Sequence, residues 1–276
     1  MTNPEFQHLL AGVSRSFFLS LRLLPAAVRP SLSLAYALAR ASDTISDSSD
    51  VPAEKRIRAL RGLPDVLPTE CFDVPVAAEQ ALLDQLPALL ARLAASPDRE
   101  LIEKTWKTIR DGQIFDIERF PSPSPLSPAE LERYVYLVAG CVGEFWTDLC
   151  LARLPDPFQS PATEMRVLGR EFGEALQRVN ILRDRASDAA HGRMYVSPDD
   201  VQAEISRARA GLAAGTAYAA ATRSRLLRAS VALPADLGRQ TLDLLANSPS
   251  TPRVRVTRPR VWLALLRAVL ARRREF

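Results

Sequence analysis

Apolar residues recur every three or four positions along most of this chain, and no other feature restricts its fold as strongly. Side chains at that spacing share one face of an α-helix, so each such segment predicts an amphipathic helix. We expect helices at about residues 4–24, 29–47, 52–63, 76–95, 98–119, 128–153, 162–189, 198–228, 236–246 and 258–274. No alternating strand pattern and no repeat of fixed period appears between them. The pattern predicts an all-α fold, with residues 1–276 as one domain.

The composition narrows the class of protein further. Among 276 residues there are 3 cysteines and 2 histidines, without a CxxC pair, which disfavours both a disulfide framework and the common zinc sites. Glu5, Arg15 and Arg22 interrupt the amino-terminal apolar residues, and no uncharged apolar run approaches the ~20 residues of a membrane-spanning helix. We therefore expect a soluble or peripheral protein in the reducing cytoplasm, with the inner face of a membrane as the alternative location.

Two aspartates four residues apart, Asp43 and Asp47, stand in the segment RASDTISD at 40–47. With Tyr36 and Arg40 they form one stripe along the expected helix. For a single DxxxD motif, the solvated face of an amphipathic helix is the more frequent explanation. Like charges at this spacing cost only about a few tenths of a kcal/mol in water. One such stripe is weak grounds for a functional site.

A second stripe strengthens the case. Gln177, Asn180, Asp184 and Asp188 follow each other at intervals of three, four and four residues. Both stripes run beside apolar residues that predict largely buried helices, and a buried carboxylate pair is costly unless a cation neutralises it. Mg²⁺ suits this role, because it binds one or two carboxylates and completes its shell with water and substrate phosphates. We predict that the four aspartates of two facing helices hold Mg²⁺ around a diphosphate.

Three arginines are candidate partners for the same phosphates, namely Arg15, Arg40 and Arg183. A guanidinium donates forked hydrogen bonds that match a phosphate group. For each arginine taken alone, an ordinary surface or intrahelical ion pair is an equally good explanation.

The segment YVYLVAGCVGEFW at 134–146 is the third informative stretch. It is apolar, begins with Tyr134 and Tyr136, and holds Gly140 and Gly143 within a helical pattern. A glycine inside a helix costs about 1 kcal/mol relative to alanine, so these two indicate either close helix packing or room for a ligand. A tyrosine on a cavity wall can relay a proton or stabilise a carbocation through its ring.

Together these stretches resemble the squalene and phytoene synthases, which join two allylic prenyl diphosphates head to head. SRSFFLSLRLLP at 14–25 is similar to the opening motif of that family, and RASDTISD to its first aspartate-rich motif. YVYLVAGCVG at 134–143 is similar to its central tyrosine motif, and NILRDRASDAAHGRMYV at 180–196 to its second aspartate-rich motif. The resemblance implies an isoprenoid-synthase helical bundle with a central active-site cavity, Mg²⁺ dependence and two successive half-reactions.

The resemblance also assigns roles to single residues, by the motif position that each one matches. The carboxylates that hold Mg²⁺ and diphosphate are matched by Asp43, Asp47, Asp184 and Asp188, and the diphosphate contacts by Arg15, Tyr36, Arg40 and Arg183. The polar pair beside the second motif is Gln177 and Asn180. Tyr134 matches the central tyrosine that assists proton loss, and Ser16 and Phe17 match the opening wall. The first motif departs from the family because it has no third acid between its aspartates.

The implied reaction condenses two prenyl diphosphates. We expect two C15 farnesyl diphosphates to give presqualene diphosphate, a cyclopropylcarbinyl diphosphate, and then squalene or a related C30 product. Phytoene synthesis from two C20 geranylgeranyl diphosphates is the alternative within the family. A non-catalytic assembly or lipid-binding factor of the same fold is the alternative outside enzymes, and the presence of both aspartate pairs disfavours it. The sequence has no GxGxxG fingerprint, so it does not indicate NADPH, whose use in the second half-reaction stays open.

The segment RPRVWLALLRAVLARRR at 258–274 mixes apolar residues with arginines. A helix packed on the core with solvated arginines is the favoured explanation, and a helix lying on an anionic membrane is the alternative. We do not expect nucleic acid as a partner, because the arginines alternate with leucine and valine and no nucleic-acid-binding module precedes them.

Overall fold

The computed structural model describes residues 4–13, 17–68, 72, 74–120, 122, 124–247 and 254–271, and it is 78% helical. No strand occurs within these ranges, so the predicted all-α class is confirmed. The helices are α1 (Pro4–Val13), α2 (Phe17–Leu23), α3 (Arg29–Asp47), α4 (Ala53–Gly62), α5 (Ala77–Asp84), α6 (Leu86–Ala94), α7 (Arg99–Arg119), α8 (Pro128–Val135), the π-helix η1 (Tyr136–Gly140), α9 (Cys141–Arg153), α10 (Ala162–Ala190), the 3₁₀-helix η2 (Pro198–Asp200), α11 (Val201–Ala221), α12 (Arg225–Asn247) and α13 (Arg258–Leu270).

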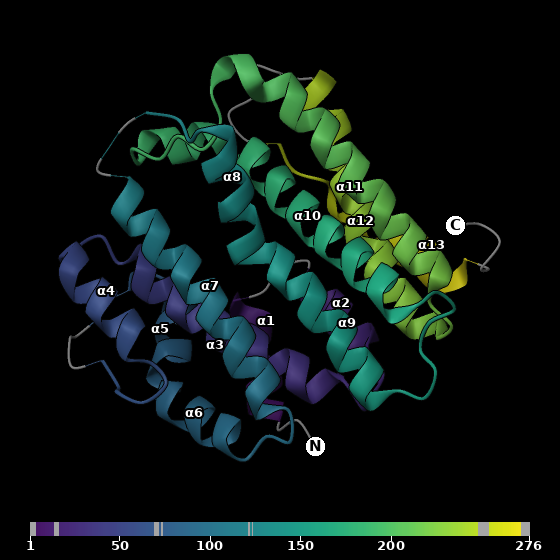
Figure 1. Ribbon diagram of the computed structural model, residues 1–276, viewed down its shortest axis with the longest axis horizontal. Helices are drawn as coiled ribbons and strands as arrows, with labels where there is room; N and C mark the ends of the chain where they lie inside the picture. Colours follow the sequence, from purple (N-terminus) through teal and green to yellow (C-terminus); the bar gives the residue numbers. More distant parts are fainter. Residues whose placement is uncertain are drawn as a thin grey trace.

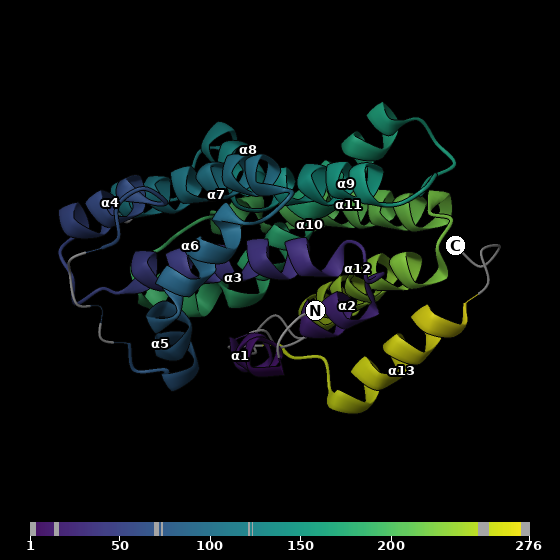
Figure 2. The ribbon, with the colours of Figure 1, turned by 90° about the horizontal axis from the view of Figure 1, so that it is seen from below.

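Helix α10, with 29 residues, organises the bundle. It packs against α9 and η1 on one side and α11 on another, and these helices run side by side in Figure 1. Helix α3 packs against α7 and is surrounded by α4, α5 and α6. Helix α12 contacts α2, α10, α11 and α13, and Figure 2 shows α13 on the outer side of the molecule. The two aspartate-bearing helices, α3 and α10, therefore belong to different parts of one bundle.

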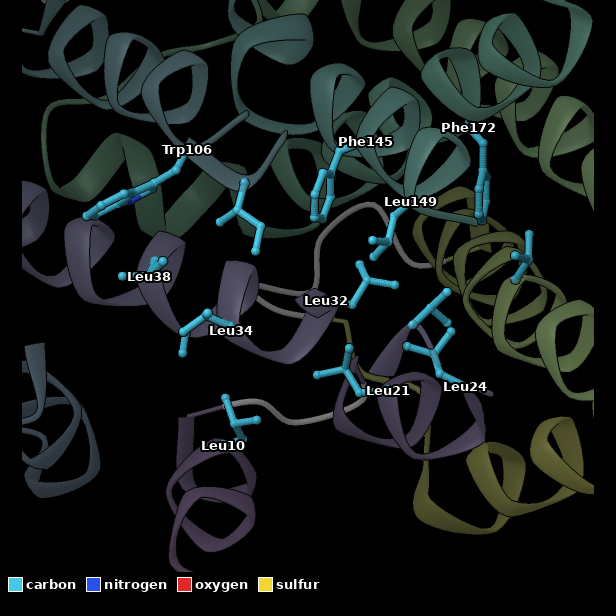
Figure 3. Close-up of a cluster of buried hydrophobic side chains, with 14 of the residues drawn as sticks. Leu10, Leu21, Leu24, Leu32, Leu34, Leu38, Trp106, Phe145, Leu149 and Phe172 are labelled. Carbon is cyan, nitrogen blue, oxygen red and sulfur yellow. The ribbon is translucent and has the colours of Figure 1, made fainter. Parts of the chain in front are cut away.

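The core that positions α3 is drawn in Figure 3. Leu34 and Leu38 of α3 lie near Trp106 of α7, while Phe145 belongs to α9 and also points into this interior. The indole Nε1 of Trp106 donates to the hydroxyl of Ser42 at 3.0 Å, so its buried N–H is satisfied. This bond fixes the rotation of α3 one residue before the first aspartate of the stripe.

The glycines of the tyrosine segment serve close helix packing. A Cβ atom on Gly143 would lie 1.8 Å from the carbonyl oxygen of Gly169, and one on Gly173 would lie 2.3 Å from that of Ala139. Side chains cannot occupy such positions, so the backbones of η1 and α9 directly contact α10. Of the two explanations that the sequence leaves open, the structure favours close packing at Gly143.

Several predicted helix boundaries are wrong. The segment 76–95 divides at Gln85, whereas the segment 4–24 is covered by α1 and α2 on either side of residues 14–16, which lie outside the described residues. Helix α11 ends at Ala221 because the next residues bond to another part of the chain: Arg223 N donates to Pro157 O at 2.9 Å.

 Helix α12 thus begins at Arg225, 11 residues before 236, and has 23 residues in all, with Pro234 inside it. The predicted short helix at 236–246 is corrected to this long one. Pro234 lacks the N–H that would donate to the preceding turn, and the helix continues past it.

Helices α8, η1 and α9 form one continuous helical stretch, Pro128–Arg153. By length and composition this stretch is able to cross a membrane, with a mean hydropathy of 1.4 over its most apolar 18 residues. Of that window, 39% is buried inside the protein, and the stretch packs against α7 and α10. A core helix of a soluble protein has the same properties, so this is weak support for a membrane span.

Candidate active site

The first aspartate pair lies on the last two turns of α3. Arg40 donates hydrogen bonds to Asp43 and also to Glu79 of α5, so this arginine joins the two helices. The Arg40 Nε atom is buried and has no acceptor among the residues that the structure describes. Tyr36 donates from its hydroxyl to the carbonyl oxygen of Val13 at 3.4 Å, which links α3 to α1. The predicted stripe is therefore present on one helix, with its arginine already paired.

The second pair lies at the end of α10. Arg183 donates from Nε to Oδ1 of Asp184 at 3.1 Å, and Asp188 follows one turn later. Asn180 Nδ2 donates to Gln177 Oε1 at 3.5 Å, so the predicted polar pair is also in contact. All members of the predicted second stripe thus lie along one helix.

A tight turn after α10 brings the two pairs together. The helix ends at Ala190, and Gly192 adopts φ 75°, a left-handed conformation that glycine takes without steric cost. The backbone N–H of Arg193 then donates to the carbonyl oxygen of Asp188 at 2.9 Å. The reversed chain directs the Arg193 side chain toward α3, where its Nη2 lies 2.9 Å from Oδ1 of Asp47.

Arg193 also contacts α7. Its Nε lies 3.4 Å from Oδ2 of Asp116, and Tyr195 donates its hydroxyl to Oδ1 of the same aspartate at 2.7 Å. Tyr134 in turn donates to the Tyr195 hydroxyl at 3.5 Å, and the two rings stack with centroids 5.0 Å apart. A continuous chain of three hydrogen bonds and the Arg193–Asp116 ion pair therefore runs from Tyr134 through Tyr195, Asp116 and Arg193 to Asp47.

Sequence reasoning missed three members of this network, namely Asp116, Arg193 and Tyr195. Arg193 and Tyr195 stand inside the quoted segment NILRDRASDAAHGRMYV, but the helical stripe that led to the aspartates stops where α10 stops. The glycine before Arg193 is the available signal, since it marks a turn that can return the chain to the site. Asp116 has no such signal, because it is a single buried acid on α7.

Burial and the neighbouring carboxylate raise the pKa of one aspartate in each pair. Burial, then the neighbouring Asp47, raises the pKa of Asp43 to about 7, although Arg40 acts in the opposite direction. Burial, then Asp184, raises the pKa of Asp188 to about 6, and Arg193 partly offsets this. Burial lowers the pKa of Arg193, but Asp116 and Asp47 outweigh that effect and the net shift is upward. Arg193 thus interacts electrostatically with Asp47 of α3 and with Asp188 of α10, so both aspartate pairs lie around this arginine.

Tyr134 and Tyr136 have different surroundings. Tyr134 is buried in a second apolar cluster with Tyr195, and burial raises its pKa well above the usual range. Tyr136 instead donates its hydroxyl to Glu144 at 3.2 Å. The guanidinium carbon of Arg170 lies over the Tyr136 ring, 4.7 Å from the ring centroid. Only Tyr134 joins the network of the aspartates.

Some predicted site residues fall outside what the structure describes. Arg15 and Ser16 lie outside the described residues, and of Phe17 only the backbone is described, as the first residue of α2. Two surface hollows of about 620 and 760 Å³ lie along α4 and the neighbouring face of α7, and neither is lined by an aspartate of the two pairs. Their position separates them from the acidic site, and the central cavity stays a prediction.

The described part of the chain contains no group of three or more histidine, cysteine or acidic side chains arranged to hold a metal ion. The four aspartates are held as two pairs, and Asp43, Asp47 and Asp184 each make an ion pair with an arginine. The structure therefore brings both pairs to one region without joining them into one cluster.

An all-α bundle in which two separate helices direct paired aspartates and arginines at one region defines the class of isoprenoid synthases. The family model of squalene/phytoene synthase matches residues 10–204, which is more than half of the chain. This chain belongs to the squalene/phytoene synthase family, whose members are prenyltransferases that condense prenyl diphosphates head to head. The resemblance inferred from the four motifs is confirmed.

Three relatives illustrate the range of the family. The chain is 31% identical over 201 residues to a bifunctional lycopene cyclase/phytoene synthase of Colletotrichum graminicola, covering 68% of this chain and 33% of that protein. It is 31% identical over 190 residues to a phytoene synthase of Mycobacterium bovis, covering 68% and 55%. It is 29% identical over 186 residues to squalene synthase BSS of Botryococcus braunii, covering 65% and 39%. The matches thus span from a third to just over half of the length of these relatives.

Solved structures support the same fold. The chain is similar to TcSQS in complex with the ligand BPH1237, with a TM-score of 0.81 and 21% identity over 96% of this chain and 85% of that one. It is similar to a dehydrosqualene synthase in complex with a ligand, with a TM-score of 0.65 and 21% identity over 96% and 94% of the two chains. At these identities the likeness establishes the isoprenoid-synthase fold.

The raised pKa values of Asp43 and Asp188 predict how stability depends on pH when no divalent cation is bound. Both carboxyls hold a proton more tightly in the folded chain than in the unfolded chain, so they favour folding fully below about pH 4. That contribution is lost as the pH rises through about 6 for Asp188 and about 7 for Asp43. Because 38% of the Asp43 side chain is exposed, solvent screens the repulsion and we expect a loss of no more than about 1 kcal/mol.

Thermal unfolding of EDTA-treated protein between pH 5 and pH 8 measures this effect. The Tm is expected to fall with rising pH in the wild type and to fall less in Asp43→Asn. An equal slope in both proteins would show that Asp43 does not carry the raised pKa.

Proposed function

We propose that this chain is a Mg²⁺-dependent prenyltransferase that condenses two prenyl diphosphates head to head, with two farnesyl diphosphates as the first substrates to test. The observation that carries the proposal is the convergence of two aspartate pairs, from α3 and α10, on Arg193. Membership of the squalene/phytoene synthase family supports it. Geranylgeranyl diphosphate is the second candidate substrate, because relatives named phytoene synthase match 68% of this chain.

The donors present fit a hard divalent cation. Mg²⁺ prefers oxygen ligands and takes one or two carboxylates from the protein. The raised pKa values of Asp43 and Asp188 indicate that the arginines do not fully offset the carboxylates. We propose that Asp43, Asp47, Asp184 and Asp188 hold the metal. When bound, Mg²⁺ would offset the charge of the leaving diphosphate, which favours ionisation of the allylic C–O bond.

Three arginines of the site supply fixed donors to the same diphosphate, namely Arg40, Arg183 and Arg193. A guanidinium carries five N–H donors, so an arginine that pairs with one carboxylate keeps donors for a phosphate oxygen. The buried Nε of Arg40, which has no acceptor among the described residues, supports this role most directly. These donors bind and orient the diphosphate, while its charge develops further during ionisation.

We propose that Tyr134 handles a proton of the reacting hydrocarbon. Its hydroxyl is neutral at ordinary pH, because burial raises its pKa. The aromatic rings of Phe115 and Tyr195 lie beside it, with centroids 6.1 and 5.0 Å away. Such rings exclude water and stabilise a nearby cation. We propose that the Tyr134 hydroxyl oxygen accepts a proton as Tyr134 passes its own proton to Tyr195, which in turn passes one to the carboxylate of Asp116.

Product identification tests the proposed reaction. The purified chain is incubated with Mg²⁺ and either farnesyl or geranylgeranyl diphosphate, with and without NADPH, and the released pyrophosphate and extracted lipid are measured. We expect pyrophosphate release and a C30 product, or presqualene diphosphate, from farnesyl diphosphate. A C40 product from geranylgeranyl diphosphate alone would shift the proposal to phytoene synthesis. No pyrophosphate from either substrate would contradict both and favour a non-catalytic factor.

Substitution of Arg193 tests the proposed site at a single residue. Arg193→Ala removes the link between α3, α7 and the end of α10 and also one phosphate donor, so kcat/KM is expected to fall by about 100-fold. The matched control is Arg209→Ala, which removes an exposed arginine that pairs with Asp243 at 2.9 Å. Steady-state pyrophosphate release compares the variants. A similar small effect of both changes would exclude Arg193 from the site.

A further inference from the structure

The carboxyl-terminal helix α13 is packed against α12 by its smallest side chains. Ala264 is 1% exposed and Ala268 is buried beside it, while Trp262 is 63% exposed and Leu270 is 59% exposed. Leu263 and Leu266 are exposed as well. The favoured prediction, a helix packed on the core, accounts for the alanines. It does not account for four large apolar side chains that face away from the protein.

The orientation of α13 is fixed by the fold. Arg225 of α12 donates from Nε to the carbonyl oxygen of Val269 at 2.6 Å, near the end of the helix. Val269 itself packs against the core together with Leu265. Helix α13 therefore cannot turn its apolar face inward without losing these contacts, and that face remains a permanent part of the surface.

Arginines border the exposed apolar face on both sides. At 100° per residue, Trp262, Leu266 and Leu270 follow one another along the middle of this face. Arg258 lies on one edge, and Arg260 and Arg267 lie on the other. All three arginines are exposed, and residues 254–271 contain no acidic residue. An apolar stripe between two basic edges is the arrangement of a helix that lies in the surface of an anionic bilayer.

We propose that α13 docks this chain on an anionic lipid bilayer, with Leu263, Leu266 and Leu270 inserted among the acyl chains and Trp262 at the boundary between the acyl chains and the headgroups. Charge complementarity favours this occupant over a second copy of the chain, because two copies of α13 would bring arginines of like charge together. A tryptophan at the edge of the apolar layer fits the membrane interface, where its ring is partly in contact with water. The docking concerns binding and is independent of the proposed reaction.

The position of α13 agrees with such docking. In Figures 1 and 2 α13 lies at the opposite side of the molecule from α4, the helix that follows the aspartate-bearing end of α3. A bilayer at α13 would therefore leave the acidic end of the bundle in water, where charged diphosphates are dissolved.

Vesicle flotation with the full chain tests the proposal. The wild type is mixed with vesicles of phosphatidylcholine containing phosphatidylglycerol, and in parallel with vesicles of phosphatidylcholine alone. We expect flotation with the anionic vesicles. Two variants should lower the partition coefficient by about 100-fold: Trp262→Ser/Leu266→Ser/Leu270→Ser, through lost apolar burial, and Arg258→Gln/Arg260→Gln/Arg267→Gln, through lost charge. Both variants change exposed side chains, and circular dichroism verifies that they are folded.

The matched control replaces three exposed valines elsewhere, as Val66→Ser/Val76→Ser/Val167→Ser, and should float like the wild type. Sedimentation without vesicles detects self-association. The proposal is overturned if the wild type does not float, or if the α13 variants float as well as the control. One further outcome would overturn it: no protein floats, the wild type is a dimer, and the apolar variant is a monomer. The exposed face of α13 would then be an interface between copies of this chain.

Discussion

Asp43→Asn and Asp184→Asn are each expected to lower the rate of pyrophosphate release by about 10²–10³-fold. Each change removes one negative oxygen ligand from a pair while keeping the shape of the side chain. The diphosphate then loses much of the charge compensation that it needs as it leaves. The fold should persist in both variants, because Arg40 keeps its second partner, Glu79, and because the repulsion between paired carboxylates is relieved. Initial rates of pyrophosphate release and the Tm in EDTA measure the two effects.

Asp243→Asn is the control for both variants. Asp243 also pairs with an arginine, Arg209, at 2.9 Å, but it lies exposed on α12. Its activity should equal that of the wild type. Near-normal rates in Asp43→Asn or Asp184→Asn would show that the aspartate pairs do not hold the diphosphate.

Gly143→Ala is expected to have the largest effect on stability. The added Cβ would lie 1.8 Å from the carbonyl oxygen of Gly169, so α9 and α10 must separate. Neither atom can move independently, because the oxygen belongs to the backbone of α10 and the Cβ is bonded directly to the backbone of α9. We expect a loss of about 3 kcal/mol or more, comparable to severe overpacking of a core. For a chain of this size that corresponds to a Tm decrease of about 5 °C or more, measured by circular dichroism.

The control for this change is Gly62→Ala at the end of α4. There the new Cβ would lie 3.3 Å from the Cβ of Val66, a side chain on the surface. Alanine also favours the helix over glycine, so we expect the Tm to change by no more than about 2 °C. Equal Tm values for Gly143→Ala and the wild type would contradict the close contact of α9 and α10.

Local patterns were sufficient to predict the fold class and the members of the two aspartate stripes. Residues such as Asp43 and Asp47, or Asp184 and Asp188, share a helix face through spacing alone. Most helix bodies were predicted for the same reason. The sequence could not predict where α11 ends, because that boundary depends on hydrogen bonds to residues 157–159.

The connection between the stripes could not be predicted, because it is formed by residues far apart in sequence. Arg193 meets Asp47 across 146 positions, and Tyr195 meets Asp116 across 79. Neither contact follows from a helical period. Both depend on the left-handed turn at Gly192, which returns the chain toward α3 and α7.

The helix α13 shows a further limit of periodicity. Its apolar residues predict an amphipathic helix, but the pattern does not state which face meets the protein. In the structure the small side chains of Ala264 and Ala268 meet α12, and Trp262 faces outward. Only the packing shows that the small side chains of α13 face the protein and that the large apolar ones face away from it.

The central claim is that the aspartate pairs of α3 and α10 form one metal-dependent diphosphate site. The most direct measurement is the binding of Mn²⁺, as a probe for Mg²⁺, in the presence of farnesyl S-thiolodiphosphate, an analogue that resists ionisation. Electron paramagnetic resonance counts free and bound Mn²⁺ in the wild type, Asp43→Asn, Asp184→Asn and the control Asp243→Asn. We predict that the wild type and the control bind Mn²⁺ together with the analogue and that each site variant loses most of this binding. Wild-type Mn²⁺ binding in either site variant would contradict a single site built from both helices.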